Sequence, residues 1–558
     1  MEWFEIKSPK KIPAMIASLS LDQRLRRLIY MNSVMPEFHV GDPDIYQVHL
    51  SSLRLTVLQE ALDDDLKQLF LLINKAMAKG GIPRRPIIFQ LLALLMTNPE
   101  ATADQKNRIM AKVLELSDND KDFFGFICCY TRSRAGCKLP TSVAKGVRKF
   151  YGAKNPEELA RSIAASERIC GWSHKDLIKL AHVKPNSPLM SAVFNYILTR
   201  KLDEDATEAQ LEVLRIIKQA EQLRRCVDPA EAAILLKTSE FSLEHLMPSL
   251  TGSEQVWNAV LLKLSTQQIL GLLLKLHKLN FLTPASLISC LVIQLLTDPE
   301  RVEKSGVHPL EVFKQLRRLE KGGKPVDPKL LTYLKTTKKL SEENLRKIQE
   351  TQPIDCPHIV SALWRCFDLA CANVTPSHKR YLVVIEVPPV GENRLCIGSK
   401  TVTYLEAAVA FAAVLQRVEP QVTLAVHQKA DSLQLVRVKK PCPVEELLRQ
   451  VAATNSAGAS LPTCFTWATA HRERVDVFVN FVQKSPRRSG HSRSPALSES
   501  MLNYQTAMNL PNTKMIVFIP VESPLEGWDK TPTKVLTIMG FDHIACKVAQ
   551  CFARDDFS

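Results

Sequence analysis

The sequence has 558 residues, of which 46% are apolar and 23% charged, and this size and balance exclude both a single hydrophobic core and a mainly disordered chain. Lys and Arg outnumber Asp and Glu by 73 to 58, a formal net charge of +15. Such an excess favours a polyanionic partner, either nucleic acid or an acidic membrane surface, and a uniformly basic solvated surface is the alternative.

The amino-terminal segment carries acidic and basic side chains among its first eleven residues and lacks the apolar core of a secretory signal. The fourteen cysteines form no CxxC pair and no cluster with zinc-ligand spacing, so they are typical of reduced, buried thiols. No apolar stretch reaches the roughly 18 residues that cross a bilayer. We expect a cytoplasmic or nuclear protein without a membrane segment.

A long succession of helices is predicted from about Ser51 to Asp368, because apolar residues recur there at spacings of three and four. Polar or Pro/Gly breaks interrupt the pattern every 15 to 25 residues. Trp257–Leu276 and Pro284–Leu296 each predict one helix. Because no strict period emerges, a degenerate helical-hairpin solenoid is favoured over a consensus repeat.

The densest basic region runs from Arg132 to Lys184 and holds twelve basic against four acidic side chains, a net +8. Lys145, Arg148 and Lys149 fall within one helical turn, and Lys175 and Lys179 are four residues apart, so each set is expected to project from one helix face toward a phosphate track. The aromatic neighbours Phe150, Tyr151 and Trp172 could stack on unpaired bases, although core packing is the commoner role.

A second basic helix face is predicted further along, with an ordinary solvated face as the alternative. Its cations are spaced three or four apart, and the other side of the helix is apolar. The cations are Lys314, Arg317, Arg318 and Lys321, opposite Phe313, Leu316 and Leu319.

After Pro376, short β-branched runs alternate with helical stretches, which is typical of a parallel α/β sheet. The predicted strands are Tyr381–Val387, Val422–His427, Val475–Val482 and Met515–Ile519, and the predicted helices are Tyr404–Gln416, Val444–Val451 and His543–Phe552. Residues 484–500 are predicted to be a flexible insertion. Ser485 and Ser494 each precede proline and could be phosphorylated, with an unregulated loop as the alternative.

Catalytic patterns are scarce. The stretch Gly398–Thr401 lacks the glycine spacing of a phosphate loop, and no GxSxG, HExxH or paired-carboxylate arrangement appears. We therefore predict a binding protein that is not an enzyme and has no cofactor.

The stretch Gly171-Trp-Ser-His-Lys-Asp-Leu-Ile-Lys-Leu-Ala-His-Val-Lys-Pro185 closely resembles the signature of the TROVE family of Ro ribonucleoproteins. The likeness continues in the family's order to the carboxy terminus. It runs through Val256-Trp257, His308-Pro309, Lys379–Leu382, Cys442-Pro443, Trp467-Ala468, Asp476–Phe478 and Met539–Asp542.

This resemblance implies a mainly α fold, in which a ring of HEAT-like helical repeats at residues 46–373 is followed by an α/β von Willebrand factor A-like domain at 374–558. Residues 1–45 would be an amino-terminal extension without a family counterpart. Family members bind small noncoding Y RNAs on the outer ring surface and capture the single-stranded 3′ ends of misfolded RNAs through the central hole.

The resemblance also implies that His182, with Lys184 beside it, contacts RNA. Together with the basic region, the expected RNA-binding residues are His182, Lys184, Arg168, Lys145, Arg148, Lys149, Lys175 and Lys179. A lysine and an arginine that the family uses on RNA align with Ala165 and Ile169, so the binding surface is expected to be shifted or weakened.

The family's metal site in the von Willebrand factor A-like domain uses oxygen ligands, and the aligned positions here are degenerate. They read Glu386, Pro388, Val390, Ala459 and Gln483. Two hydroxyls have become apolar side chains, and Ala459 has no oxygen to offer, so we predict no bound Mg²⁺ or Ca²⁺.

The leading hypothesis is noncatalytic binding of small Y-like or misfolded noncoding RNA, in RNA quality control or ribonucleoprotein assembly. The alternative is a protein-interaction scaffold that has lost RNA binding, with protein partners on the von Willebrand factor A-like domain.

Overall fold

The computed structural model describes most of the chain. The described residues are 14–41, 52–78, 81–134, 139–201, 206–323, 328–338, 340–342, 345, 353–389, 391–429, 432–438, 442–454, 460–483, 497–521 and 534–557. They form two compact units: unit 1 comprises residues 1–34 and 43–263, and unit 2 comprises residues 35–42 and 264–558. The domain boundaries expected at residues 45 and 373 stay predictions.

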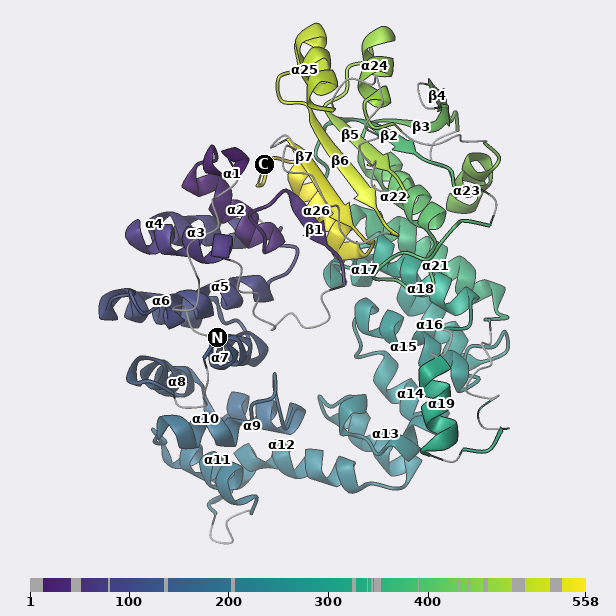
Figure 1. Ribbon diagram of the computed structural model, residues 1–558. Helices are drawn as coiled ribbons and strands as arrows, with labels where there is room; N and C mark the ends of the chain where they lie inside the picture. Colours follow the sequence, from purple (N-terminus) through teal and green to yellow (C-terminus); the bar gives the residue numbers. More distant parts are fainter. Residues whose placement is uncertain are drawn as a thin grey trace. The chain divides into compact units, whose positions relative to one another are not determined.

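Unit 1 is built from helices that follow one another along the chain, from the purple through the blue into the teal part of Figure 1. They are α1 (Ala14–Ala17), α2 (Leu21–Met31), α3 (Ser52–Asp63), α4 (Lys67–Ala78), α5 (Pro86–Thr97), α6 (Ala103–Leu116), α7 (Asp120–Arg132), α8 (Thr141–Ala153), α9 (Pro156–Ala165), α10 (His174–Ala181), α11 (Pro188–Thr199), α12 (Glu208–Arg225), α13 (Pro229–Thr238) and α14 (Glu254–Leu261), with 3₁₀ turns η2 (Leu243–His245) and η3 (Pro248–Gly252).

Capping residues in the sequence mark where several of these helices start. Thr102 before α6 and Thr207 before α12 each form a capping box with a glutamine three residues later, which satisfies two otherwise unpaired backbone donors. Helix α5 begins with Pro86 at a position where the missing N–H costs nothing. Its residues from Ile87 to Met96 are all buried, so α5 lies in the interior of unit 1.

The prediction of a single helix over Trp257–Leu276 is wrong. Helix α14 ends at Leu261, and a new helix, α15 (Thr266–Lys278), begins after Ser265. Ser265 forms a capping box with Gln268, and this local start signal overrides the continuous apolar pattern. The helix predicted over Pro284–Leu296 is present as α16 (Leu287–Thr297).

Unit 2 combines helices with a seven-stranded sheet. Its helices are α15, α16, α17 (Pro299–Ser305), α18 (Pro309–Glu320), α19 (Pro328–Thr336), α21 (Pro357–Ala370), α22 (Tyr404–Val418), α23 (Val444–Ala452), α24 (Thr463–Ala470), α25 (Leu497–Met508) and α26 (His543–Ala553), with the 3₁₀ turn η4 (Cys371–Asn373). Its strands are β1 (Glu37–His39), β2 (Arg380–Ile385), β3 (Gln421–Lys429), β4 (Ser432–Leu435), β5 (Val477–Phe481), β6 (Lys514–Ile519) and β7 (Val535–Met539).

The strands lie in the order β1-β7-β6-β5-β2-β3-β4, and all neighbours are parallel except the antiparallel pair β3 and β4. Val384 pairs with Ala425 of β3 on one side and with Asn480 of β5 on the other, so β2 is central. The four predicted strands and three predicted helices of this α/β domain are confirmed. Strands β1, β4 and β7 were not predicted.

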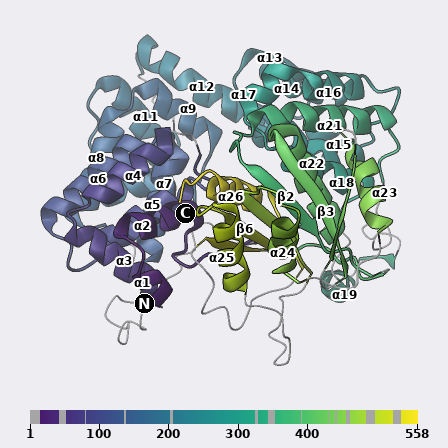
Figure 2. The same cartoon turned by 90° about the horizontal axis from the view of Figure 1, so that it is seen from above.

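Helices cover both faces of the sheet. Helices α24 and α25 bury one face, where Phe465 and Tyr504 pack on Phe478 of β5. On the other face, Phe411 of α22 contacts the stacked rings of Phe481 and Phe518. Figure 2 shows α18 and α21 lying beside α22, so the helical part of unit 2 packs directly on the α/β domain.

Strand β1 comes from the start of the chain and forms one edge of this sheet. Phe38 pairs with Ile538 of β7 and is buried, and the Val40 N–H donates a hydrogen bond of 2.8 Å to the carbonyl oxygen of Met539. Three residues carry too little pattern to predict a strand, because its position depends on a partner some 500 residues away in the sequence. In the described part of the chain, no helix is both long and apolar enough to span a bilayer.

Candidate nucleic-acid interface

The sequence signature begins at a tight turn that leads into α10. Ile169 and Trp172 exchange two backbone hydrogen bonds, of 2.8 and 2.9 Å, across Cys170 and Gly171, both of which have positive φ. The glycine adopts this backbone without the penalty that a Cβ would carry. Ser173 then caps α10 in a capping box with Asp176, so the turn and the cap fix where the helix starts.

The signature ends where α10 ends, at His182. This residue has φ 50° and ψ 50°, the left-handed conformation of a helix C-cap, and its N–H bonds back to the carbonyl oxygens of Ile178 and Lys179. The backbone therefore directs the chain away from the helix, and the side chains of His182 and Lys184 are exposed.

A second histidine of the signature, His174, is buried and holds the neighbouring helices together. Its Nδ1 lies 2.9 Å from the Tyr151 hydroxyl of α8, and its Nε2 lies 2.9 Å from the Ser162 hydroxyl of α9. Ser162 also donates a hydrogen bond to Asp120 of α7, which pairs with Lys154 at 2.6 Å. The network thus joins α7, α8, α9 and α10.

Burial lowers the pKa of His174 to about 4, against a raising effect from Asp120. A general base needs access to substrate and a pKa near the working pH, and this imidazole has neither. We therefore assign the Ser162–His174 contact a structural role. The sequence pointed to His182 and not to His174, whose burial only the packing of four helices reveals.

Helix α8 presents the predicted cations on its exposed side. Lys145, Arg148 and Lys149 are all exposed, whereas the aromatic residues that follow, Phe150 and Tyr151, are buried. Phe150 stacks on Phe123 at 4.0 Å between ring centroids, so core packing, and not base stacking, occupies these two rings.

Arg148 connects α8 to the end of α10. Its Nη1 donates a hydrogen bond of 2.8 Å to the carbonyl oxygen of Ala181, the last residue of α10. The cations of α8 therefore lie next to those at the carboxy-terminal end of α10. We call this group the basic surface: Lys145, Arg148, Lys149, Lys179, His182 and Lys184, all of them exposed.

The four lysines of the basic surface have no ion-pair partner within the described ranges of the chain. Their charge is therefore not neutralised locally, and a polyanion could bind there by releasing its counterions. The structure brings these predicted residues together as the sequence suggested.

Two predicted residues lie toward the other end of α10. Arg168, just before the tight turn, donates a hydrogen bond of 2.9 Å to the carbonyl oxygen of Gly171. Lys175 is half-buried and lines a shallow recess together with Ser173 and His174. Arg168 and Lys175 thus lie near the start of α10, away from the basic surface at its end.

The recess with Lys175 shares Ser166, Glu167 and Arg200 with a larger cleft of about 610 Å³. Ala165, which the sequence resemblance aligns with a lysine of the family, lines this cleft. Three arginines from other helices also line it: Arg200, the C-cap of α11, and Arg224 and Arg225 at the end of α12. The sequence did not point to these arginines because they follow the dense basic region by some 16 to 41 residues.

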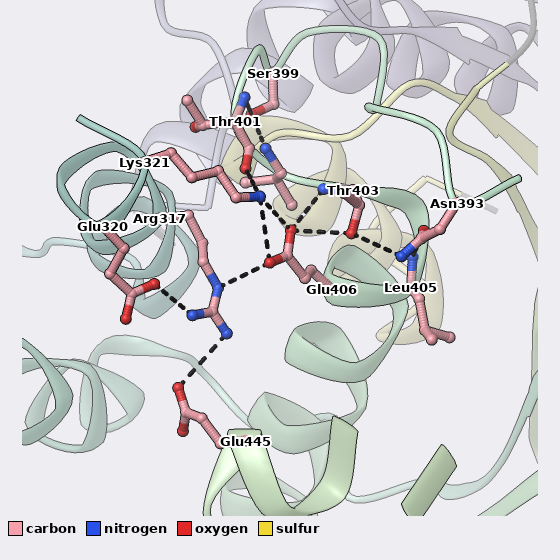
Figure 3. A network of polar contacts seen from close by, with 11 residues as sticks. Arg317, Glu320, Lys321, Asn393, Ser399, Thr401, Thr403, Leu405, Glu406 and Glu445 are labelled. Atoms are coloured by element: carbon pink, nitrogen blue, oxygen red, sulfur yellow. Dashed lines mark hydrogen bonds and ion pairs between the residues drawn. The ribbon is translucent and has the colours of Figure 1, made fainter. Parts of the chain in front are cut away.

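The second basic face, on α18, is not a free cationic ridge, so that prediction is wrong. Figure 3 shows Arg317 and Lys321 turned toward carboxylates of unit 2. Arg317 is only 7% exposed. Its guanidinium lies 3.3 Å from Glu406 of α22 and 3.5 Å from Glu445 of α23.

The same carboxylate organises the start of α22. Glu406 accepts a hydrogen bond of 2.8 Å from the Thr403 N–H in a capping box, and it pairs with the Lys321 ammonium at 3.0 Å (Figure 3). Lys321 also donates to the carbonyl oxygen of Thr401 at 2.6 Å. Arg317 of α18 and Lys321 at its C-cap thus hold the helical part of unit 2 to its α/β domain.

Two of the degenerate metal positions, Glu386 and Gln483, follow the carboxyl ends of β2 and β5, where ligands bind in open α/β sheets. Glu386 follows β2, and one of its carboxylate oxygens accepts a hydrogen bond of 2.8 Å from the Gln483 N–H after β5. Pro388 is half-buried in the same loop. Val390 and Ala459 lie outside the described residues, so the loss of the metal site stays a prediction.

The chain is similar to known proteins over most of its length. Residues 380–553 match the family described as "Ro60 vWA domain". A curated protein of Deinococcus radiodurans named "RNA-binding protein RO60" is 24% identical over 413 residues, which are 74% of this chain and 71% of that protein. A Caenorhabditis elegans protein of the same name is 22% identical over 453 residues, 74% of this chain and 65% of that protein.

The crystal structure of the Deinococcus radiodurans Ro (RSR) protein has the same fold, with a TM-score of 0.79 and 20% identity over 96% of this chain and 100% of that one. The predicted fold class, helical with a carboxy-terminal von Willebrand factor A-like domain, is therefore confirmed. The chain is thus similar to Ro ribonucleoproteins over most of its length, as the sequence resemblance indicated, and residues 380–553 match the Ro60 vWA domain family.

Proposed function

We propose that this protein binds RNA through the basic surface without catalysing a reaction on it, and that its ligands are small noncoding RNAs of the Y type or misfolded noncoding RNAs. The names of two curated relatives support the RNA partner. The observation that carries the proposal is the bond from Arg148 to Ala181, because it places the cations of α8 beside those that end α10.

The energetics of such a surface are those of phosphate contacts. Each lysine that meets a phosphate releases a counterion, so affinity should fall steeply as salt rises. These contacts carry little sequence information, and selection would come from RNA shape and from accessible single strands. The imidazole of His182 can bond to a phosphate or stack on an unpaired base beside these lysines.

The experiment is a salt titration of RNA affinity by fluorescence anisotropy, using a structured RNA with a single-stranded tail. The triple variant Lys145→Glu, Lys149→Glu, Lys179→Glu should bind at least about a hundredfold more weakly and give a flatter salt slope. The control is Lys218→Glu with Lys237→Glu, which reverses charge at exposed lysines of α12 and α13.

If both sets of variants lost RNA affinity equally, the loss would come from the change in net charge, and the proposal that RNA binds this surface would be wrong. Sequencing the RNA that copurifies with the protein identifies the ligands. Recovery of no RNA from cells, together with no affinity in vitro, would favour the protein-interaction scaffold, with partners on the Ro60 vWA domain.

A further inference from the structure

The cleft of unit 1 is large enough to hold a nucleotide and is lined mainly by polar and charged side chains. Its volume of about 610 Å³ falls in the range of small-molecule sites, roughly 300 to 1,000 Å³. It is formed by the end of α9, the C-cap of α11, the last turn of α12 and η2. Arginine and glutamate side chains line it in equal number, so it is not simply a cationic groove.

Several of these charged groups already have partners. Arg224 donates a hydrogen bond of 2.7 Å to the carbonyl oxygen of Ala164. Glu221 accepts a hydrogen bond of 2.5 Å from the Tyr196 hydroxyl. Arg224 and Glu221 are thus already used within the protein, and the other charged side chains that line the cleft carry the argument.

The remaining charged residues are Arg225, Glu244 and the pair Arg200 and Glu167. Arg225 and Glu244 are exposed and have no ion pair or side-chain hydrogen bond with any residue that the structure describes. Arg200 lies over the Tyr196 ring at 5.7 Å and pairs with Glu167 at 3.4 Å. The Glu167 side chain is 78% exposed, so an incoming anion can replace it at little cost.

The cleft therefore offers both guanidinium donors and a carboxylate acceptor. A nucleotide matches both, because its phosphate accepts from arginine and its base donates N–H groups to a carboxylate. Guanine presents two adjacent donors, the ring N–H and the amino group, whereas uracil presents one N–H. A bidentate contact to Glu244 would thus prefer guanine.

The cleft is also continuous with the proposed RNA track. The recess that contains Lys175 shares Arg200, Glu167 and Ser166 with it, and Lys175 is one helical turn from Lys179 of the basic surface. A single strand that leaves the basic surface along α10 would reach the cleft with its next nucleotides. We propose that this cleft receives one unpaired guanosine nucleotide, with its phosphate on Arg200 and Arg225 and its base on Glu244. This inference rests on the proposed RNA binding.

The first test needs no variant. Fluorescence anisotropy would compare an oligouridylate with the same oligonucleotide carrying one guanosine or one inosine, which lacks the amino group. We expect the guanosine oligonucleotide to bind about tenfold more tightly than the oligouridylate, and inosine to lose most of this gain. Equal affinity for all three would overturn the guanine site, while binding of all three would leave the proposed RNA function standing.

The second test uses Glu244→Gln and Arg225→Ala, with Arg215→Ala as the matched control on the same helix and outside the cleft. Glu244→Gln should remove the guanosine preference and keep the affinity for oligouridylate. Arg225→Ala should weaken both, and Arg215→Ala should change neither. A preserved guanosine preference in Glu244→Gln would contradict the inference, whereas loss of all RNA binding in the wild-type protein would contradict the proposed function instead.

Discussion

The guanidinium of Arg148 donates its hydrogen bond to the carbonyl oxygen of Ala181, the residue immediately before His182. This bond satisfies a carbonyl at the end of α10 that has no partner within the helix, and it places a cation at the negative end of the helix dipole. It also fixes the position from which His182 projects. The left-handed C-cap at His182 therefore stands directly beside the contact that joins the two halves of the basic surface.

The first prediction separates the backbone of His182 from its side chain. At φ 50°, glycine is favoured over histidine, so His182→Gly should keep or raise the free energy of unfolding, by up to about 1 kcal/mol. The same variant should lower RNA affinity, because it removes the imidazole. Urea unfolding and anisotropy measure the two effects.

Asn280→Gly is the control for this prediction, because Asn280 is exposed and has φ 59° outside the basic surface. It should change stability in the same direction and leave RNA affinity unchanged. If His182→Gly bound RNA as well as the wild-type protein, His182 would have no role in binding.

The second prediction concerns acid. Burial lowers the pKa of His174 to about 4 and that of His308 to about 3, so both imidazoles are neutral in the folded protein. The unfolded chain takes up these protons below pH ~6.5, so the unfolded state binds more protons and is favoured as pH falls. Stability should be highest above pH ~6.5 and decline toward pH ~4, by up to about 3 kcal/mol from His174 alone.

His174→Asn tests this origin of the acid sensitivity. The variant should be less stable at neutral pH, because it breaks the contacts with Tyr151 and Ser162, and its stability should change less between pH ~7 and ~5. The readout is the urea midpoint at each pH. An unchanged pH dependence in the variant would show that His174 is not responsible.

Much of the fold could be predicted because its signals are local. Apolar runs such as Leu382 to Ile385 mark central strands, and capping residues mark helix starts. Strand β1 could not be predicted, since Phe38 becomes a strand residue only by pairing with Ile538. Likewise, the burial of Arg317 depends on Glu406, 89 residues further along the chain, which no helix periodicity reports.

The candidate site divides in the same way. The lysines of α8 and α10 follow from helical spacing, and the structure brings them together. The cleft is built from α9, α11, α12 and η2, so Arg225 and Glu244 have no common pattern in the sequence. Only the packing of those helices places their side chains around one space.

The third prediction tests the role assigned to Arg317. Arg317→Ala should lower the free energy of unfolding of unit 2 by about 3 kcal/mol, because it removes the buried guanidinium that pairs with the largely buried carboxylate of Glu406. Arg318→Ala, next to it and half-buried without a described ion pair, should change it by less than about 1 kcal/mol. If the two variants changed thermal unfolding equally, the ion pairs of Arg317 would not stabilise unit 2, and α18 would carry an ordinary solvated basic face.

The fourth prediction concerns divalent cations. A carboxylate oxygen of Glu386 is already used by the Gln483 N–H, and Pro388 offers no side-chain oxygen. Calorimetric titration with Mg²⁺ or Ca²⁺ should therefore give no saturable heat, and EDTA should leave Tm unchanged. A stoichiometric binding isotherm that Glu386→Ala abolished would refute the predicted loss of the metal site.

The last prediction concerns how β1 is held in the sheet. Gly540 follows β7 with φ +87°, and a Cβ there would lie 2.7 Å from the Cβ of Val40 and 2.9 Å from the carbonyl oxygen of Ile397. Gly540→Ala must therefore displace the residues after β1, and we expect a loss of about 2 kcal/mol or more in the free energy of unfolding. Urea unfolding measures this loss.

Gly391→Ala separates close packing from backbone strain, because Gly391 has φ +86° and a Cβ there would meet nothing within 4 Å. This control should cost only about 1 kcal/mol. Hydrogen exchange at the Val40 amide, which bonds to Met539, should accelerate in Gly540→Ala and not in Gly391→Ala, since only the first substitution pushes against β1. Similar exchange rates in both variants would mean that close packing around Gly540 does not hold this strand.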